Sequence, residues 1–117
     1  MNHGYLIRHA DNCVIQNISR TTNFLERMRG LLGSPPLKVN EGLLIAPCSS
    51  VHTFGMHYTI DLAFLDQNWK IVKTVRSLKP WRMAASRSAS MVLELAADRL
   101  EQLNLTTGQQ LEWRNDL

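Results

Sequence analysis

One short run of the chain restricts its fold more than any other. Residues 60–65 read Ile-Asp-Leu-Ala-Phe-Leu and are apolar at every position except Asp61. Successive side chains of a β-strand point to opposite faces, so this run predicts a central strand covered on both sides. Because a carboxylate is costly to bury alone, we expect Asp61 to have hydrogen-bonding partners. Two interpretations remain open for Asp61. It belongs to a structural polar network, or it orients a ligand or acts as an acid–base group.

Other short strands are expected along the rest of the chain. Residues 5–8 and 13–18 predict a hairpin around the turn at 9–12. Further candidate strands, bounded by Pro, Ser, Asn or Asp, are 43–45, 69–76, 91–95 and a last one ending at Leu111 and Trp113. Residues 66–68 fit a three-residue hairpin loop in which Asn68 adopts a positive φ.

One or two short helices complete the predicted fold. Thr22 and Asn23 are both possible N-caps, Asn23 and Glu26 have capping-box spacing, and Gly33 suits a helix exit. Between them lies one apolar stripe, which should face the sheet: Phe24, Leu25, Met28, Leu31 and Leu32. A second helix is expected within 96–103. The sequence therefore predicts a single domain over 1–117 of mainly β (α+β) class, a barrel-like or sandwich-like sheet of short strands with one or two short helices.

Charge and composition limit the classes of function. The formal net charge is only +3, and no apolar run approaches the ~20 residues of a membrane-spanning helix. No basic–aromatic repeat or nucleic-acid motif is present, so nucleic-acid binding is a distant alternative. The N-terminus lacks the apolar centre of a secretory signal, which predicts a cytoplasmic protein. We therefore expect Cys13 and Cys48 to be free thiols.

The densest polar segment, residues 47–56, reads Pro-Cys-Ser-Ser-Val-His-Thr-Phe-Gly-Met and lies beside apolar runs. Cys48 and His52 could form a nucleophile and base, with Asp61 as a third group, in a thiol- or histidine-dependent hydrolase or transferase. On a straight strand, however, Cys48 and His52 would be ~13 Å apart, so catalysis requires a turn between them. The alternative, which we favour, is a buried cysteine and a hydrogen-bonded core histidine.

No metal or other cofactor is expected. A metal site would draw on Cys48, His52, His57 and Asp61, but His52 and His57 fall on opposite faces of a strand. Phe54 and Met56 share the parity of His52, so we expect the imidazole to point inward with them. We also expect His52 and Asp61 to join one buried hydrogen-bonded network.

Several segments together resemble domain-of-unknown-function family 192. They are residues 27–33, 41–45, 47–56, Asp61 with 64–66, 78–82 and 92–95, in that order along the chain. The sequence departs from the family pattern after Met56, where the family usually reads basic, aromatic, proline and this chain has His57, Tyr58 and Thr59. The resemblance implies a compact, mainly β fold and implies little about function.

The leading hypothesis is a non-catalytic small-ligand or partner-binding module with a site around residues 48–56. The expected ligand-binding residues are Arg27, Arg29, Ser49, Ser50, His52, Thr53, Asp61, Trp81 and Arg82. At least one helix arginine should turn towards residues 48–56 as an anion or carboxylate partner. Trp81 either caps the pocket or covers an open end of the sheet. A small molecule or anion, or a protein, is the expected partner.

Overall fold

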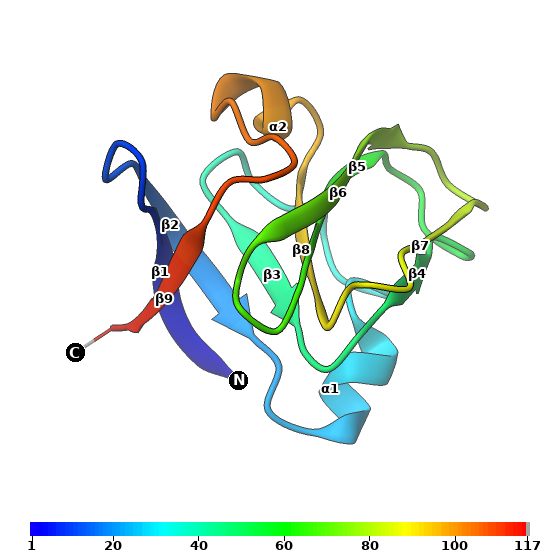
Figure 1. Ribbon diagram of the computed structural model, residues 1–117. Helices are drawn as coiled ribbons and strands as arrows, with labels where there is room; N and C mark the ends of the chain where they lie inside the picture. Colours follow the sequence, from blue (N-terminus) through cyan, green and yellow to red (C-terminus); the bar gives the residue numbers. More distant parts are fainter. Residues whose placement is uncertain (117) are drawn as a thin grey trace.

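A curled, half-barrel sheet of seven strands forms the body of the protein (Figure 1). The computed structural model describes residues 1–116. The strands are β1 Asn2–Arg8, β2 Val14–Arg20, β3 Gly42–Ile45, β5 Ile60–Leu65, β6 Ile71–Leu78, β8 Met91–Ala96 and β9 Leu111–Asn115. Their order in the sheet is β6-β5-β8-β3-β2-β1-β9, and only the β2–β3 pair is parallel. A bridge between Lys70 and Gln110 brings the two edges of the sheet together. The predicted mainly β class is confirmed.

A separate two-stranded sheet, which the sequence did not predict, lies to one side of the large sheet (Figure 1). It consists of β4 Ser50–His52 and β7 Met83–Ala85, paired antiparallel with Val51 opposite Ala84 and His52 opposite Met83. Val51 is buried, while His52 and Met83 face outward. This small sheet thus covers part of the large one and exposes its other face.

The core consists of two apolar clusters, one on each face of the central strands. The first includes Leu44, Ala63 and Leu93, inside the curl of the sheet. The second includes Leu43, Leu62 and Val92, and Val51 of the small sheet packs into it. Alternate residues of β3, β5 and β8 therefore enter different clusters, which explains why β5 is buried at every position, as its sequence predicted.

The two helices are α1 Phe24–Arg29 and α2 Arg99–Gln102. Of the two predicted N-cap candidates, Thr22 and Asn23, the structure has Asn23, whose side chain accepts the Glu26 N–H. The predicted helix exit is wrong, because Gly30 takes φ 52° and ends α1 at Arg29. Among residues 1–116, no helix is both long and apolar enough to cross a membrane.

The early end of α1 also overturns the prediction that its apolar stripe faces the sheet. Phe24, Leu25 and Met28 are exposed at 62%, 77% and 66%, and Leu32 at 43%. Only Leu31, which follows the helix, is buried and joins the second cluster. Because the chain turns at Gly30, the helix is too short to bring its stripe onto the sheet, and its apolar side chains remain in solvent.

The β5–β6 turn differs from the prediction in one residue. Asp66 accepts the backbone N–H groups of Asn68 and Lys70, which organises the turn around its carboxylate. Trp69, and not Asn68, then takes the positive φ, at 67°. The Trp69 ring stacks on Trp113, which gives this unfavourable backbone conformation a packing partner. The β1–β2 hairpin and the remaining strands lie within a few residues of their predicted positions.

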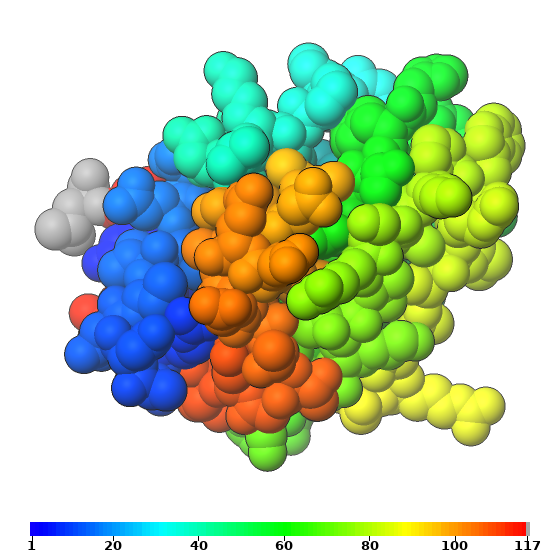
Figure 2. Space-filling model, turned by 90° about the horizontal axis from the view of Figure 1, so that it is seen from above, coloured from blue at the N-terminus to red at the C-terminus, as the bar shows by residue number. Residues whose placement is uncertain are grey.

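Asp61 has the partners that its burial requires, but they are not those predicted. Its carboxylate accepts the Ser77 N–H at 2.9 Å and the Leu100 N–H, in the first turn of α2, at 3.0 Å. Asp98 at the start of α2 makes no side-chain cap, so Asp61 supplies it from a distant strand. Figure 2 shows the orange α2 segment between the blue N-terminal strands and the green β5–β6 pair. The predicted network of Asp61 with His52 is therefore wrong.

We expect Asp61→Ala to lower the free energy of unfolding by about 1–3 kcal/mol, because it leaves two backbone donors without an acceptor. Urea denaturation followed by circular dichroism would measure the change. The matched control is Glu101→Ala, an exposed carboxylate of α2. Equal, small effects of the two substitutions would show that the Asp61 cap contributes nothing to stability.

Candidate functional site

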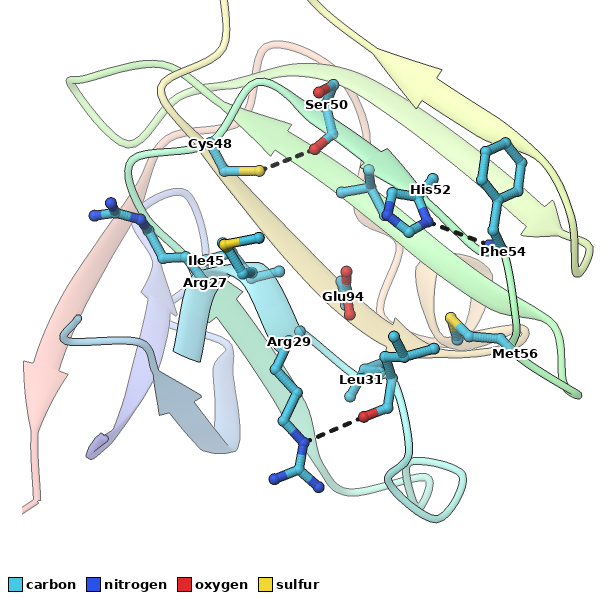
Figure 3. A pocket seen from close by; sticks show the side chains of 14 residues that line it. Arg27, Arg29, Leu31, Ile45, Cys48, Ser50, His52, Phe54, Met56 and Glu94 are labelled. Carbon is cyan, nitrogen blue, oxygen red and sulfur yellow. Dashed lines mark hydrogen bonds between the residues drawn. The ribbon is translucent and has the colours of Figure 1, made fainter. Parts of the chain in front are cut away.

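A small pocket lies between α1 with its following turn on one side and β4 on the other (Figure 3). Its volume is about 80 Å³. Its lining residues are Arg27, Met28, Arg29, Gly30, Leu31, Leu32, Ile45, Cys48, Ser50, Val51, His52, Phe54, Met56 and Glu94. Leu31, Ile45, Val51 and Met56 are buried, and apolar and polar groups contribute about equally to the lining.

Glu94, at the centre of the pocket in Figure 3, is the residue that the sequence analysis missed. It lies in β8 opposite Leu43 and Leu62 and is only 3% exposed. Within residues 1–116, its Oε2 atom is buried and has no hydrogen-bonding partner. Burial raises the pKa of this carboxyl to about 8. The floor of the pocket is therefore a carboxyl group that is mostly protonated at neutral pH.

Tyr58 is a second polar side chain left unpaired in this neighbourhood. Its hydroxyl is buried and has no hydrogen-bonding partner within residues 1–116. Burial raises the pKa of Tyr58, and the nearby Glu94 raises it further. Tyr58 does not line the pocket at Glu94 but a neighbouring depression of about 250 Å³, so its hydroxyl is not counted among the groups of this pocket.

Cys48 lines the pocket as a thiol rather than a thiolate. Its Sγ atom donates to the Ser50 carbonyl at 3.1 Å. Burial raises the pKa of Cys48 and Glu94 raises it further, while the Ser50 backbone and the Arg27 charge lower it by less. Such surroundings are the reverse of those that activate a cysteine nucleophile. Both Cys48 and Cys13 are free, as predicted.

His52 lies at the rim of the pocket with its ring exposed to solvent. Its Nδ1 atom accepts the Phe54 N–H at 3.3 Å, and the two rings stack at 5.0 Å. Within residues 1–116, it makes no hydrogen bond to Cys48 or Asp61. The predicted inward imidazole is wrong because Val51 is the residue of β4 that faces the core, which places His52 on the outer face.

Arg27 and Arg29 line the pocket through their stems. Figure 3 shows both guanidinium groups turned away from Glu94. Arg27 lies 5.7 Å from the centre of the Phe24 ring, and Arg29 Nε donates to the Leu32 carbonyl at 3.2 Å. Neither guanidinium donates a hydrogen bond to residues 48–56. The prediction that at least one of these arginines turns towards that segment as an anion or carboxylate partner is therefore wrong.

The remaining predicted ligand-binding residues fall outside this pocket. Thr53 is fully buried, and its hydroxyl ties two loops together by donating to the Lys79 carbonyl and accepting the Arg82 N–H. Trp81 is 62% exposed and stacks on Phe54 at 6.0 Å. Asp61 lies on the opposite face of β5 from the second cluster. The structure therefore brings together Arg27, Arg29, Cys48, Ser50 and His52, and separates them from Ser49, Thr53, Asp61, Trp81 and Arg82.

Among the other depressions on the described part of the surface, one of about 250 Å³ is lined by Tyr58, the other residue with a buried unpaired oxygen, but it contains no acidic side chain. Another of about 320 Å³ is lined by Pro35, Pro36 and Leu37 among others, and holds no buried unpaired polar atom. Among residues 1–116, no three His, Cys, Asp or Glu side chains lie together as they would around a metal ion.

Comparison with known proteins identifies the family. The sequence model of DUF192, described as an uncharacterised ACR, matches residues 7–113. The chain belongs to the DUF192 family. A UPF0127 protein of Thermococcus sibiricus is 32% identical over 97 residues, which cover 77% of this chain and 61% of that relative. A UPF0127 protein of Pyrococcus furiosus is 33% identical over 97 residues, covering 78% of this chain and 81% of the relative. The chain thus spans less than two thirds of the first relative.

Two crystal structures share the fold. One, from Sinorhizobium meliloti and assigned provisionally as a transcription regulator, has a TM-score of 0.80 and 18% identity, covering 96% of this chain and 95% of that one. The other, a protein of unknown function from Novosphingobium aromaticivorans, has a TM-score of 0.75 and 17% identity, covering 94% and 83%. At these identities, the likeness shows the fold alone.

The raised pKa of Glu94 predicts how stability depends on pH. Folding raises this pKa from 4.5 to about 8, so between these values the folded chain holds a proton that the unfolded chain releases. The free energy of unfolding should therefore fall as pH rises from about 5 to 8, by up to about 1.4 kcal/mol per pH unit from this group. Urea denaturation at several pH values would measure the slope.

Glu94→Gln keeps the shape of the side chain but removes its titration. The slope between pH 5 and 8 should become shallower in this variant, and Glu101→Gln should leave it unchanged. If Glu94→Gln retains the wild-type slope, Glu94 does not titrate in the folded protein as proposed.

Proposed function

We propose that this chain is a non-catalytic binding module whose pocket between α1 and β4 takes a small polar head group at Glu94. The main support for this proposal is Glu94, which is 3% exposed and lines the pocket. Its buried Oε2 atom has no hydrogen-bonding partner within residues 1–116. A buried polar atom without a partner lowers stability, so its presence beside a pocket favours a ligand that completes it.

The rim of the pocket supports a ligand that extends beyond the head group. Met28, Leu32 and Phe54 line the pocket and are exposed at 66%, 43% and 41%. Trp81 continues this apolar rim through its stacking on Phe54. Exposed apolar side chains around a small pocket are typical of a binding surface. The ligand can be a small molecule or the side chain of a protein partner.

The contacts of Cys48 support binding rather than thiol catalysis. The thiol donates its hydrogen bond to a backbone carbonyl, which cannot act as a base to activate it. Burial also raises the pKa of the thiol, which keeps it protonated. No contact described above favours nucleic acid over the other partners. The two free thiols support a reducing location, and we propose the cytoplasm.

We expect Cys48 to react slowly with thiol reagents. In a Cys13→Ser variant, its second-order rate with 5,5′-dithiobis(2-nitrobenzoate) at pH 7.5 should lie below that of glutathione, because the thiolate fraction is small and the sulfur is partly buried. Absorbance at 412 nm measures the rate. The urea-unfolded variant, which should react at the rate of a free thiol, is the control. A folded rate above that of glutathione would favour the hydrolase or transferase alternative.

The binding function is tested by a fragment screen on isotope-labelled protein. Amines, carboxylates, amides and alcohols of three to six heavy atoms are added at millimolar concentration, and ¹H–¹⁵N spectra report the residues that shift. We expect at least one class to shift residues that line the pocket, with a dissociation constant that Glu94→Gln raises at least tenfold, because the head group contacts this carboxyl.

Glu101→Gln is the matched control, since it removes an exposed carboxylate on α2 and should leave binding unchanged. If no compound of any class shifts the pocket residues, or if Glu94→Gln binds as tightly as the wild type, the pocket is not a ligand site and the proposed function is wrong.

A further inference from the structure

We infer that the head group received at Glu94 is an ammonium on a short alkyl stem, a class of ligand that rests on the proposed function of the pocket. Glu94 is the one carboxyl among the lining residues, and the buried side chains of Leu31, Ile45, Val51 and Met56 form the apolar part of the walls. A cation with a compact apolar stem matches both features, because its charge meets the carboxylate while its stem contacts the walls.

The size of the pocket limits the head group. A volume of about 80 Å³ is roughly half that of a ~150 Å³ protein cavity that holds one benzene ring. This leaves room for a few heavy atoms and excludes a sugar, a nucleobase or an aromatic ring. An ammonium is a compact point charge, whereas a guanidinium is wider and planar.

The charge of the floor decides between head groups. A carboxylate or phosphate head can bind only while Glu94 is protonated, so its affinity would fall as pH rises and Glu94 ionises, whereas that of an ammonium would rise. A hydroxyl or amide can hydrogen-bond to Glu94 but gains no ionic attraction. An ammonium provides three donors and a positive charge to a carboxylate that burial otherwise holds in its neutral form.

Other ionisable groups near Glu94 belong to the elements packed against it. They are Arg27 and Arg29 of α1, Cys48 before β4, His52 of β4 and Tyr58 before β5. The two arginines oppose a cation only from the rim, because their guanidinium groups turn outward and are engaged by Phe24 and the Leu32 carbonyl (Figure 3). Cys48 and Tyr58 are neutral at pH 7, and their pKa values are raised. The buried charge nearest an entering ammonium is therefore Glu94.

Binding of an ammonium should release a proton. In the empty pocket Glu94 is mostly protonated below pH 8, and the complex requires its carboxylate, so one proton passes from Glu94 to solvent for each cation bound. Alkylammonium ions stay charged through this range, since their pKa lies near ~10.4 as in lysine. The apparent affinity should therefore rise about tenfold per pH unit up to about pH 8 and then level off.

The test uses n-butylammonium, with n-butanol, butyramide and butyrate as probes of similar length. Isothermal titration calorimetry in phosphate and in PIPES, which have different ionisation enthalpies and no primary amine, gives the number of protons released. We expect close to one proton for n-butylammonium at pH 7, binding at least tenfold tighter than n-butanol, and a tenfold or greater loss in Glu94→Gln. Glu101→Gln should bind like the wild type. The proton count comes from the wild-type protein, so the test stands even if Glu94→Gln fails to fold.

Three outcomes would overturn the inference. Equal or tighter binding of n-butanol, butyramide or butyrate at the same pocket residues would show another class of head group and leave the proposed function intact. Binding of n-butylammonium without proton release, or undiminished in Glu94→Gln, would show that the cation lies elsewhere. Binding by none of the four probes, together with an empty fragment screen, would remove both the inference and the proposed function.

The same ammonium can come from a free amine or from a lysine side chain. N-acetyl-lysine methylamide and its Nε-acetylated form separate these sources. Tighter binding of the unmodified lysine derivative than of n-butylammonium indicates a polypeptide ligand that also contacts the apolar rim. Weaker binding indicates a free amine. The Nε-acetylated form should not bind in either case, and its binding would contradict an ammonium head group.

Discussion

The covering of β3, β5 and β8 on both faces is the constraint on which the rest of the structure depends. Inside the curl of the sheet, Leu44, Ala63 and Leu93 pack with α2 and the outer strands. On the other face, Leu43 and Leu62 pack beneath the β4–β7 sheet and the turn after α1. Because no side of these strands reaches water, any polar side chain within them must find a partner in the protein or in a ligand.

Two carboxylates meet this constraint in opposite ways. Asp61 points into the first cluster and accepts two backbone N–H groups, one of which lies in the first turn of α2. Glu94 points to the other face and has no partner for its Oε2 atom within residues 1–116. One carboxylate is thus part of the fold, and the other remains open towards a pocket. The difference follows from the face on which each residue falls.

The sequence predicted β5 and the β1–β2 hairpin because their patterns are local, and it predicted the cap at Asn23 for the same reason. It did not predict β4 and β7, whose pairing joins segments some thirty residues apart. Glu94 interrupts the apolar run of β8 just as Asp61 interrupts that of β5, so the signal for it was present. It was overlooked because Asp61 is nearer to Cys48 and His52 in sequence. The β4–β7 pairing places Val51 inward and His52 outward, and Asp61 lies on the face of β5 away from the small sheet. Asp61 and His52 therefore do not meet.

The unpaired Glu94 is best understood as a cost to stability that binding offsets. A leucine or methionine at this position would fill apolar space without a buried carboxyl, so packing alone does not account for a glutamate in β8. Residues that lower stability yet occupy a pocket are a recurrent feature of functional sites, where the group that is unfavourable alone becomes favourable once its ligand is bound. The apolar rim of Met28, Leu32 and Phe54 follows the same reasoning, since exposed apolar area gains by being covered. The floor and the rim of the pocket therefore both favour a bound ligand. Both lie on the face of the sheet opposite to that of Asp61.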